Sequence, residues 1–154
     1  MKDLKIIPVE PGHEIASTLV DWIEDEWGEE TGQTREEIAE RLFAHVDCPP
    51  THAAVEASSG QPLGVITFRR FASPERDEFA VWIDALFVNP EHRNCGIGSR
   101  LIQAADDLVR PFENLMYVYT NLPPLYERIG WREVVPANDA GCSKLRKDLE
   151  SETS

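Results

Sequence analysis

Positive charge is scarce in this sequence, and the shortage argues against several functions. The 154 residues contain 15 Lys and Arg against 28 Asp and Glu, which gives a net charge of −13. A protein that binds duplex nucleic acid needs a basic face that displaces counterions from phosphates, and no basic run is present. An anionic membrane surface repels such a chain for the same reason. An acidic surface instead favours cationic partners such as amines, although the charge equally fits a role in solubility alone.

Cysteines and long apolar runs are scarce as well. The three cysteines, Cys48, Cys95 and Cys142, are an odd number without Cys-x-x-Cys spacing, which favours a reducing compartment over a disulfide framework. The histidines are scattered singly, so the sequence predicts no metal site. No stretch approaches the 18 apolar residues of a membrane span, and residues 1–10 lack the apolar segment of a signal peptide. We therefore expect a cytoplasmic protein.

The length and composition fit one globular domain. Hydrophobic residues make up 42% of the chain and charged residues 28%, which is typical of soluble domains. No repeat or linker interrupts the chain. We assign residues 1–150 to a single domain and residues 151–154 to a short polar tail.

Hydrophobic spacing predicts an alternation of strands and helices. Apolar residues at helical spacing predict helices over 13–27, 34–46 and 97–108, and we expect Gly28 and Gly32 to end the first of them. Thr34 and Glu37 have the spacing of a capping box. The strand from 79–88 and the strand from 115–120 flank a helix, so they should be parallel neighbours in an α/β or α+β sheet. Strands are predicted over 4–9, 52–57, 63–71, 79–88, 115–120, 131–135 and 143–149, with a short helix after Pro123.

A glycine-containing turn joins the central strand to the next helix. The first N–H groups of a helix have no intrahelical partner and form an anion site suited to phosphate. Gly96 and Gly98 let the backbone curl and let a phosphate approach, and Arg93 can add a charge-assisted contact. The third glycine of a dinucleotide fingerprint is absent, as is a Walker loop. By pattern alone, an ordinary tight turn that binds nothing stays open.

Two segments together carry a family resemblance. Residues 93–98, Arg-Asn-Cys-Gly-Ile-Gly, resemble the R/Q-x-x-G-x-G/A loop of the GCN5-related N-acetyltransferases (GNAT). Residues 125–131, Leu-Tyr-Glu-Arg-Ile-Gly-Trp, are similar to the Leu-Tyr-x-Lys-x-Gly-Phe segment of that family. The resemblance covers residues 79–135. It implies a mixed, mostly antiparallel twisted sheet, with a central parallel strand pair splayed around the cofactor and about four flanking helices.

The resemblance also implies an activity and a binding site. The activity is transfer of an acetyl group from acetyl-CoA to a primary amine of a small molecule or peptide, by direct attack. Acetyl-CoA would lie between the strands at 79–88 and 115–120, with a backbone N–H near Val88 as oxyanion donor. A homodimer is a family-level expectation. The implied cofactor-binding residues are Leu86, Phe87, Val88, Arg93, Asn94, Cys95, Gly96, Ile97, Gly98, Ser99 and Asn121.

Amine acetylation requires a base and an acid. An alkylammonium with a pKa of about 10.4 has no lone pair at neutral pH, so a base must accept its proton. The departing thiolate must gain a proton, and the resemblance assigns that role to the hydroxyl of Tyr126. Asp84 is the candidate base, because it is the only charge within 79–88 and strand alternation places it on one face with Trp82, Leu86 and Val88. The alternatives are a purely structural Asp84, water, and the carboxylates of Glu26, Glu29 and Glu78.

Other readings of the same residues remain open. A non-catalytic acyl-CoA-binding or sensor module on the same fold would keep residues 93–99 but transfer no acetyl group. An adaptor protein would bind nothing at that turn. Trp22 and Trp27 are expected to pack, on a helix that borders the acceptor site in the family. A group of acids forms either a solvated helix end or an attractive surface for a polycationic acceptor: Glu24, Asp25, Glu26, Glu29 and Glu30.

Overall fold

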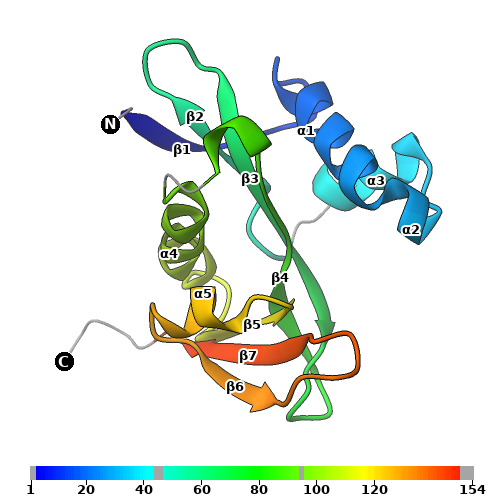
Figure 1. Ribbon diagram of the computed structural model, residues 1–154, viewed down its shortest axis with the longest axis vertical. Coiled ribbons are helices and arrows are strands. Elements are labelled where there is room, and N and C mark those ends of the chain that lie inside the picture. Colours follow the sequence, from blue (N-terminus) through cyan, green and yellow to red (C-terminus); the bar gives the residue numbers. More distant parts are fainter. Residues whose placement is uncertain (1–2, 44–46, 94–95, 150–154) are drawn as a thin grey trace.

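The computed structural model describes residues 3–43, 47–93 and 96–149, which form one seven-stranded sheet with helices on both faces (Figure 1). The strands are β1 (Leu4–Pro8), β2 (His52–Glu56), β3 (Pro62–Ala72), β4 (Phe79–Val88), β5 (Leu115–Thr120), β6 (Arg132–Val135) and β7 (Ser143–Asp148). The helices are α1 (Ala16–Ile23), the π-helix η1 (Glu24–Gly28), α2 (Glu29–Thr31), α3 (Arg35–Phe43), the 3-10 helix η2 (Pro90–His92), α4 (Ile97–Val109) and α5 (Pro123–Glu127). Within these ranges, no helix has the length and apolar character needed to cross a membrane.

The strand order is β1-β2-β3-β4-β5-β7-β6. β4 and β5 are parallel, and every other neighbouring pair is antiparallel. The helix α4 makes the crossover between β4 and β5, as expected for parallel neighbours. This arrangement confirms the predicted mixed sheet with a central parallel pair. The insertion of β7 between β5 and β6 is a feature that strand prediction alone did not provide.

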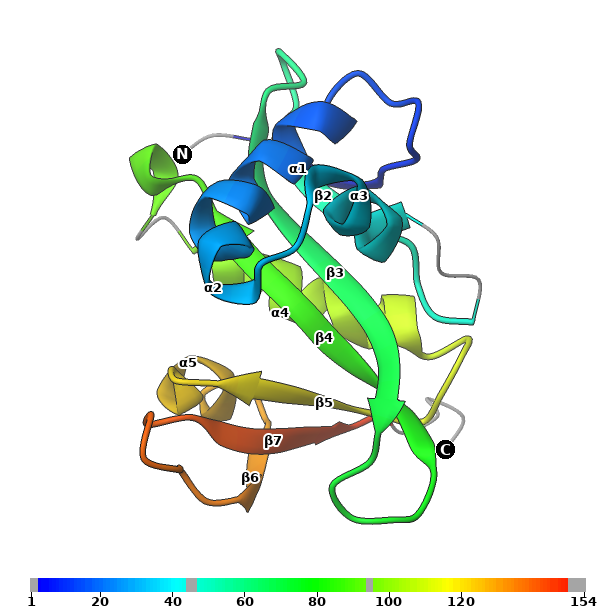
Figure 2. The same ribbon diagram turned by 90° about the vertical axis from the view of Figure 1, so that its right-hand side faces the viewer.

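The two faces of the sheet are covered by different helices. Figure 2 shows α1, α2 and α3 in front of the sheet and α4 behind it. On the rear face, Leu101 and Ile102 of α4 are completely buried. On the front face, Leu19 of α1 and Ile38 of α3 belong to a separate apolar cluster. Because full burial of one such side chain is worth about 1.5–3 kcal/mol, these contacts hold the central strands between the two helical layers.

The central strand β4 carries a β-bulge at Asp84. Ile83 pairs with Phe68 of β3 and Ala85 pairs with Thr67, so Asp84 is an additional residue on the β4 side of the ladder. A bulge bends its strand and re-aims the side chains that follow it.

The bulge reverses which side chains of β4 face α4. Ile83 lies in the core beneath α4, and beyond the bulge Leu86 and Val88 pack against that same core. Trp82 belongs to an apolar cluster of its own. The expectation that Asp84 and Trp82 share one face with Leu86 and Val88 is therefore wrong, because simple alternation holds only without the extra residue.

The first helical segment begins at Ala16, later than predicted, and continues to Thr31. Gly28 has φ −58°, an ordinary helical value, and lies where η1 continues into α2. Gly32 ends the segment with φ +70°, in the left-handed conformation that favours glycine. The expectation that Gly28 ends the helix is thus wrong, and that for Gly32 is confirmed.

The capping box at the start of α3 is confirmed by two reciprocal hydrogen bonds. Glu37 N donates to Thr34 Oγ1 at 3.1 Å, and Thr34 N donates to Glu37 Oε1 at 2.8 Å. These bonds satisfy two backbone donors that the helix itself leaves unpaired.

Candidate active site

The central parallel strands separate just beyond a short ladder. Their register pairs Trp82 with Tyr117 and Ile83 with Val118, and it stops where the bulge begins. Beyond this point β4 continues to Val88 without a ladder partner on the β5 side (Figure 2). The sheet therefore opens between β4 and β5, while β4 stays paired with β3 and β5 with β7.

The tail of β4 directs backbone groups into this opening. Asn89 N donates to Leu63 O of β3 at 2.9 Å, so the N–H group of Asn89 faces β3. Backbone groups alternate sides along a strand, so those of Leu86 and Val88 face away from β3, toward the diverging β5. This is the backbone that the resemblance assigned to the pantetheine arm of acetyl-CoA.

The N-terminus of α4 lies directly after the tail of β4. Gly96 caps the helix with φ +79°, no side chain caps it, and its first turn contains no acidic residue. The first intrahelical bond runs from Arg100 N to Gly96 O, so the N–H groups of Ile97, Gly98 and Ser99 have no acceptor within the helix. These donors, in a 13-residue helix, suit an anionic ligand. Residues Asn94 and Cys95, also predicted to bind the cofactor, lie outside the described residues.

Two glycines bring α4 close to the sheet. A Cβ on Gly98 would meet Val88 Cγ2 at 3.7 Å, an ordinary contact that places the first turn of α4 beside the tail of β4. A Cβ on Gly64 of β3 would lie 3.1 Å from Phe87 O and 3.1 Å from Leu101 Cδ1. Gly64 was missed in the sequence, although a glycine within a β-branched strand is a known sign of close backbone approach.

Arg93 and Asn121 border the same region. Arg93 Nε donates to Val88 O at 3.0 Å, so its side chain folds back over the end of β4. Asn121 is exposed in the link between β5 and α5. The residues predicted to bind the cofactor therefore gather at the end of β4 and the start of α4, with Asn121 near the end of β5.

Asp84 is held by two arginines at the bulge. Its side chain is 11% exposed; Arg41 Nε lies 2.6 Å from Asp84 Oδ2, and Arg69 Nη1 lies 3.8 Å from Asp84 Oδ1. Arg41 also donates from Nη1 to Gln33 Oε1 at 3.0 Å. These contacts fix the direction of the carboxylate and join α3 to β4. They match the structural reading of Asp84, and its role as base stays a prediction.

Tyr126 lies on α5, on the same face of the sheet as α4. Its side chain is buried in the core that α4 covers, and its ring meets that of Trp131 edge to face at a centroid distance of 5.3 Å. Burial raises the pKa of the Tyr126 hydroxyl far above its usual value. The raised pKa keeps the hydroxyl neutral and able to donate across the physiological pH range.

The two candidate catalytic residues lie on opposite faces of the sheet. Asp84 pairs with α3 on the front face, and Tyr126 packs in the core on the α4 face. Figure 2 shows these two layers on either side of the diverging strands. One candidate residue therefore lies on each side of the sheet.

The remaining candidate bases differ in their surroundings. Glu26 of η1 lies 4.0 Å from Arg93, measured from Glu26 Oε2 to Arg93 Nη2. Glu78 pairs with Arg76 at 3.4 Å in the loop between β3 and β4, and Glu29 is exposed on α2. Trp22 and Trp27 pack against the front apolar cluster, as predicted.

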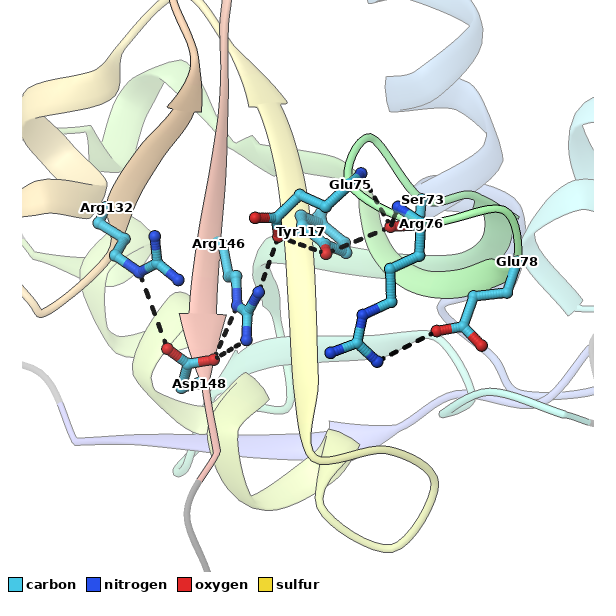
Figure 3. A network of polar contacts seen from close by, with 8 residues as sticks. All are labelled: Ser73, Glu75, Arg76, Glu78, Tyr117, Arg132, Arg146 and Asp148. Atoms are coloured by element: carbon cyan, nitrogen blue, oxygen red, sulfur yellow. Dashed lines mark hydrogen bonds and ion pairs between the residues drawn. The ribbon is translucent and has the colours of Figure 1, made fainter.

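A polar network that the sequence analysis did not predict anchors the loop between β3 and β4. Glu75 accepts hydrogen bonds from Tyr117 Oη at 2.7 Å and from Arg146 Nη1 at 2.8 Å (Figure 3). Ser73 Oγ donates to Tyr117 Oη at 3.3 Å. These hydrogen bonds lower the pKa of Glu75, chiefly through the Tyr117 hydroxyl, and tie the loop to β5 and β7.

Comparisons with known proteins agree with this geometry. No curated protein matches the sequence, whereas many solved structures share the fold. An acetyltransferase from Corynebacterium glutamicum, described as histone acetyltransferase HPA2 and related acetyltransferase, superimposes with a TM-score of 0.73 at 16% identity over 100% of both chains. An aminoglycoside 6'-acetyltransferase type Ii gives 0.71 at 20% identity over 96% of this chain and 99% of its own. A GNAT acetyltransferase from Streptococcus pneumoniae gives 0.70 at 16% identity over 96% and 100%.

At such identities the structures establish the fold, and the sequence establishes the family. The family model described as acetyltransferase (GNAT) family matches residues 12–131, which include the tail of β4, the turn before α4 and α5. Members of this family use acetyl-CoA, and the uncapped N-terminus of α4 beside the open backbone of β4 fits its diphosphate and pantetheine arm. The chain belongs to the GNAT family of acetyltransferases.

Proposed function

We propose that the protein transfers the acetyl group of acetyl-CoA to a primary amine of a small molecule or peptide by direct attack. The observation that carries the proposal is the opening between β4 and β5, where the tail of β4 lies beside the first turn of α4. Asp84 and Tyr126 lie on opposite faces of this sheet. The backbone of Leu86 and Val88 and the first N–H groups of α4 would hold acetyl-CoA, which supplies the acetyl thioester. The acceptor amine would approach from the face of α1 and α3.

In this proposal Asp84 removes a proton from the acceptor ammonium, directly or through water. An alkylammonium with a pKa of about 10.4 is almost fully protonated at pH 7 and must lose a proton before attack. Arg41 and Arg69 hold the carboxylate in one direction, so its free oxygen lone pairs are fixed relative to the opening. The two arginines act as positioning residues.

Tyr126 donates the proton that the departing thiolate requires. Burial raises the pKa of its hydroxyl, which keeps the proton in place at neutral pH and also makes the phenol a weaker acid. The transfer therefore requires the thiolate charge to form within hydrogen-bond reach of the hydroxyl. The substitution Tyr126→Phe keeps the ring that packs against Trp131 and removes only the hydroxyl that would donate this proton.

The test is an amine panel assayed by release of free thiol, with mass spectrometry of the product. Wild-type protein should acetylate at least one primary amine, and both Asp84→Asn and Tyr126→Phe should lower kcat while acetyl-CoA still binds. Wild-type rates in both variants would refute the catalytic assignments. Binding of acetyl-CoA without transfer to any amine would instead favour the sensor module.

A further inference from the structure

Three aromatic rings meet at the tip of β4, on the face covered by α1 and η1. The centroid of Phe87 lies 5.5 Å from that of Trp22 and 6.3 Å from that of Trp27. Glu26 stands beside Trp27 on η1, and its side chain is 41% exposed. We call Trp27, Phe87 and Glu26 the aromatic–acid site.

The helical turn that presents this site is a π-helix. The five residues Glu24–Gly28 take this wider turn between α1 and α2. Such turns are rare and occur often at functional sites, because they re-aim side chains that a regular helix would direct elsewhere.

A cation of the chain itself already lies in this site. The guanidinium carbon of Arg93 is 5.3 Å from the centroid of Phe87, and Arg93 Nη2 is 4.0 Å from Glu26 Oε2. The same side chain donates from Nε to Val88 O at 3.0 Å. An aromatic face, a carboxylate and a carbonyl oxygen are the three groups that attract an organic cation, and here all three surround one guanidinium.

Arg93 also lies three residues before Gly96, at the turn that would receive the diphosphate of acetyl-CoA. Its contact with Phe87 is partly exposed, and its ion pair with Glu26 is at the outer distance limit, so both are weak. Charge-assisted, bidentate hydrogen bonds from a guanidinium to a phosphate are stronger. A bound diphosphate would therefore draw the guanidinium away from Phe87 and Glu26, in competition with its hydrogen bond to Val88 O.

We propose that the aromatic–acid site binds the second ammonium group of an aliphatic di- or polyamine acceptor, and that Arg93 occupies it until acetyl-CoA binds. The inference deepens the proposed function, on which the acceptor role of this amine rests. The site is supported by the set of contacts around one cation, the guanidinium of Arg93. The acids on α2 add only long-range electrostatic attraction for a polyamine. Arg93 makes acceptor binding depend on the cofactor.

The test is calorimetric titration of spermidine, with and without saturating CoA, which carries no acetyl group and allows no turnover. In wild-type protein, CoA should tighten spermidine binding by about fivefold or more, the lower end of ordinary coupling between two sites. Arg93→Gln should bind spermidine without CoA as tightly as the wild type does with CoA. Equal affinities with and without CoA in the wild type would overturn the proposal, as would weak binding by CoA-free Arg93→Gln.

Matched variants separate this site from general charge. Glu26→Gln and Glu30→Gln each remove one negative charge from neighbouring turns, and Glu30 lies outside the aromatic–acid site. Glu26→Gln and Phe87→Leu should weaken spermidine binding in the presence of CoA and leave 1-propylamine almost unaffected. An equal loss in Glu30→Gln would contradict the proposal. Because these titrations need no acetyl transfer, an inactive protein that still shows the coupling would refute the proposed function alone.

Discussion

Replacement of Gly64 by alanine tests how closely α4 must lie against the sheet. The added Cβ would stand 3.1 Å from Phe87 O, 3.1 Å from Leu101 Cδ1 and 3.2 Å from Ile97 Cγ2. Phe87 O is backbone and both side chains are in the buried core, so none can move freely. Overpacking of this kind costs about 1–3 kcal/mol. For a domain of this size it should lower Tm by about 2–12 °C.

The same change should disturb the cofactor site, because Ile97 lies in the first turn of α4. Differential scanning calorimetry measures the stability, and titration with acetyl-CoA measures the affinity, which we expect to fall. Gly12→Ala is the matched control, since nothing lies within 4 Å of a Cβ there and its φ is not in the left-handed region. If Gly64→Ala has the same Tm and the same affinity for acetyl-CoA as Gly12→Ala, the close approach of α4 to the sheet is not required.

Three further predictions concern single residues. Tyr126→Phe should lower kcat by about 10²-fold or more, with unchanged Tm and acetyl-CoA affinity; an equal drop in affinity would point to a binding role. Thr34→Ala should cost about 1 kcal/mol, since it removes the acceptor of a capping hydrogen bond, and Tm measures this. Burial lowers the pKa of His52, so its neutral form is favoured in the folded state, and stability should fall as the pH drops below the unfolded value of about 6.5. Chemical denaturation between pH 7 and 5 should show a shallower fall in His52→Gln, and equal slopes would contradict this.

Local signals in the sequence were sufficient for the elements and the cofactor turn. The capping box at Thr34 and the glycine that ends α2 depend on neighbours a few residues away, so their patterns could be read directly. The loop at residues 93–98 could be recognised for the same reason, since backbone N–H groups and glycines carry its chemistry.

Features that depend on distant segments could not be read in this way. The bulge at Asp84 exists because β3 and β4 differ by one residue across their ladder, and neither strand alone reveals that mismatch. The pairing of Asp84 with Arg41 joins residues 43 positions apart. Arg93 was expected at a phosphate, and its ion pair with Glu26 forms only because η1 lies against the end of β4.

The most direct test of the whole account is calorimetric titration of acetyl-CoA into wild-type protein and Gly96→Ala. The φ of +79° at Gly96 costs alanine about 1–2 kcal/mol, which converts to roughly 5–30-fold in affinity if binding requires this turn. Apart from its chain neighbours, no atom of the described residues lies within 4 Å of a Cβ at Gly96, so the substitution adds no clash with them. We predict stoichiometric binding by the wild type and a loss in that range for Gly96→Ala. Absence of binding heat, or equal affinity in both proteins, would contradict the claim that the start of α4 holds the cofactor.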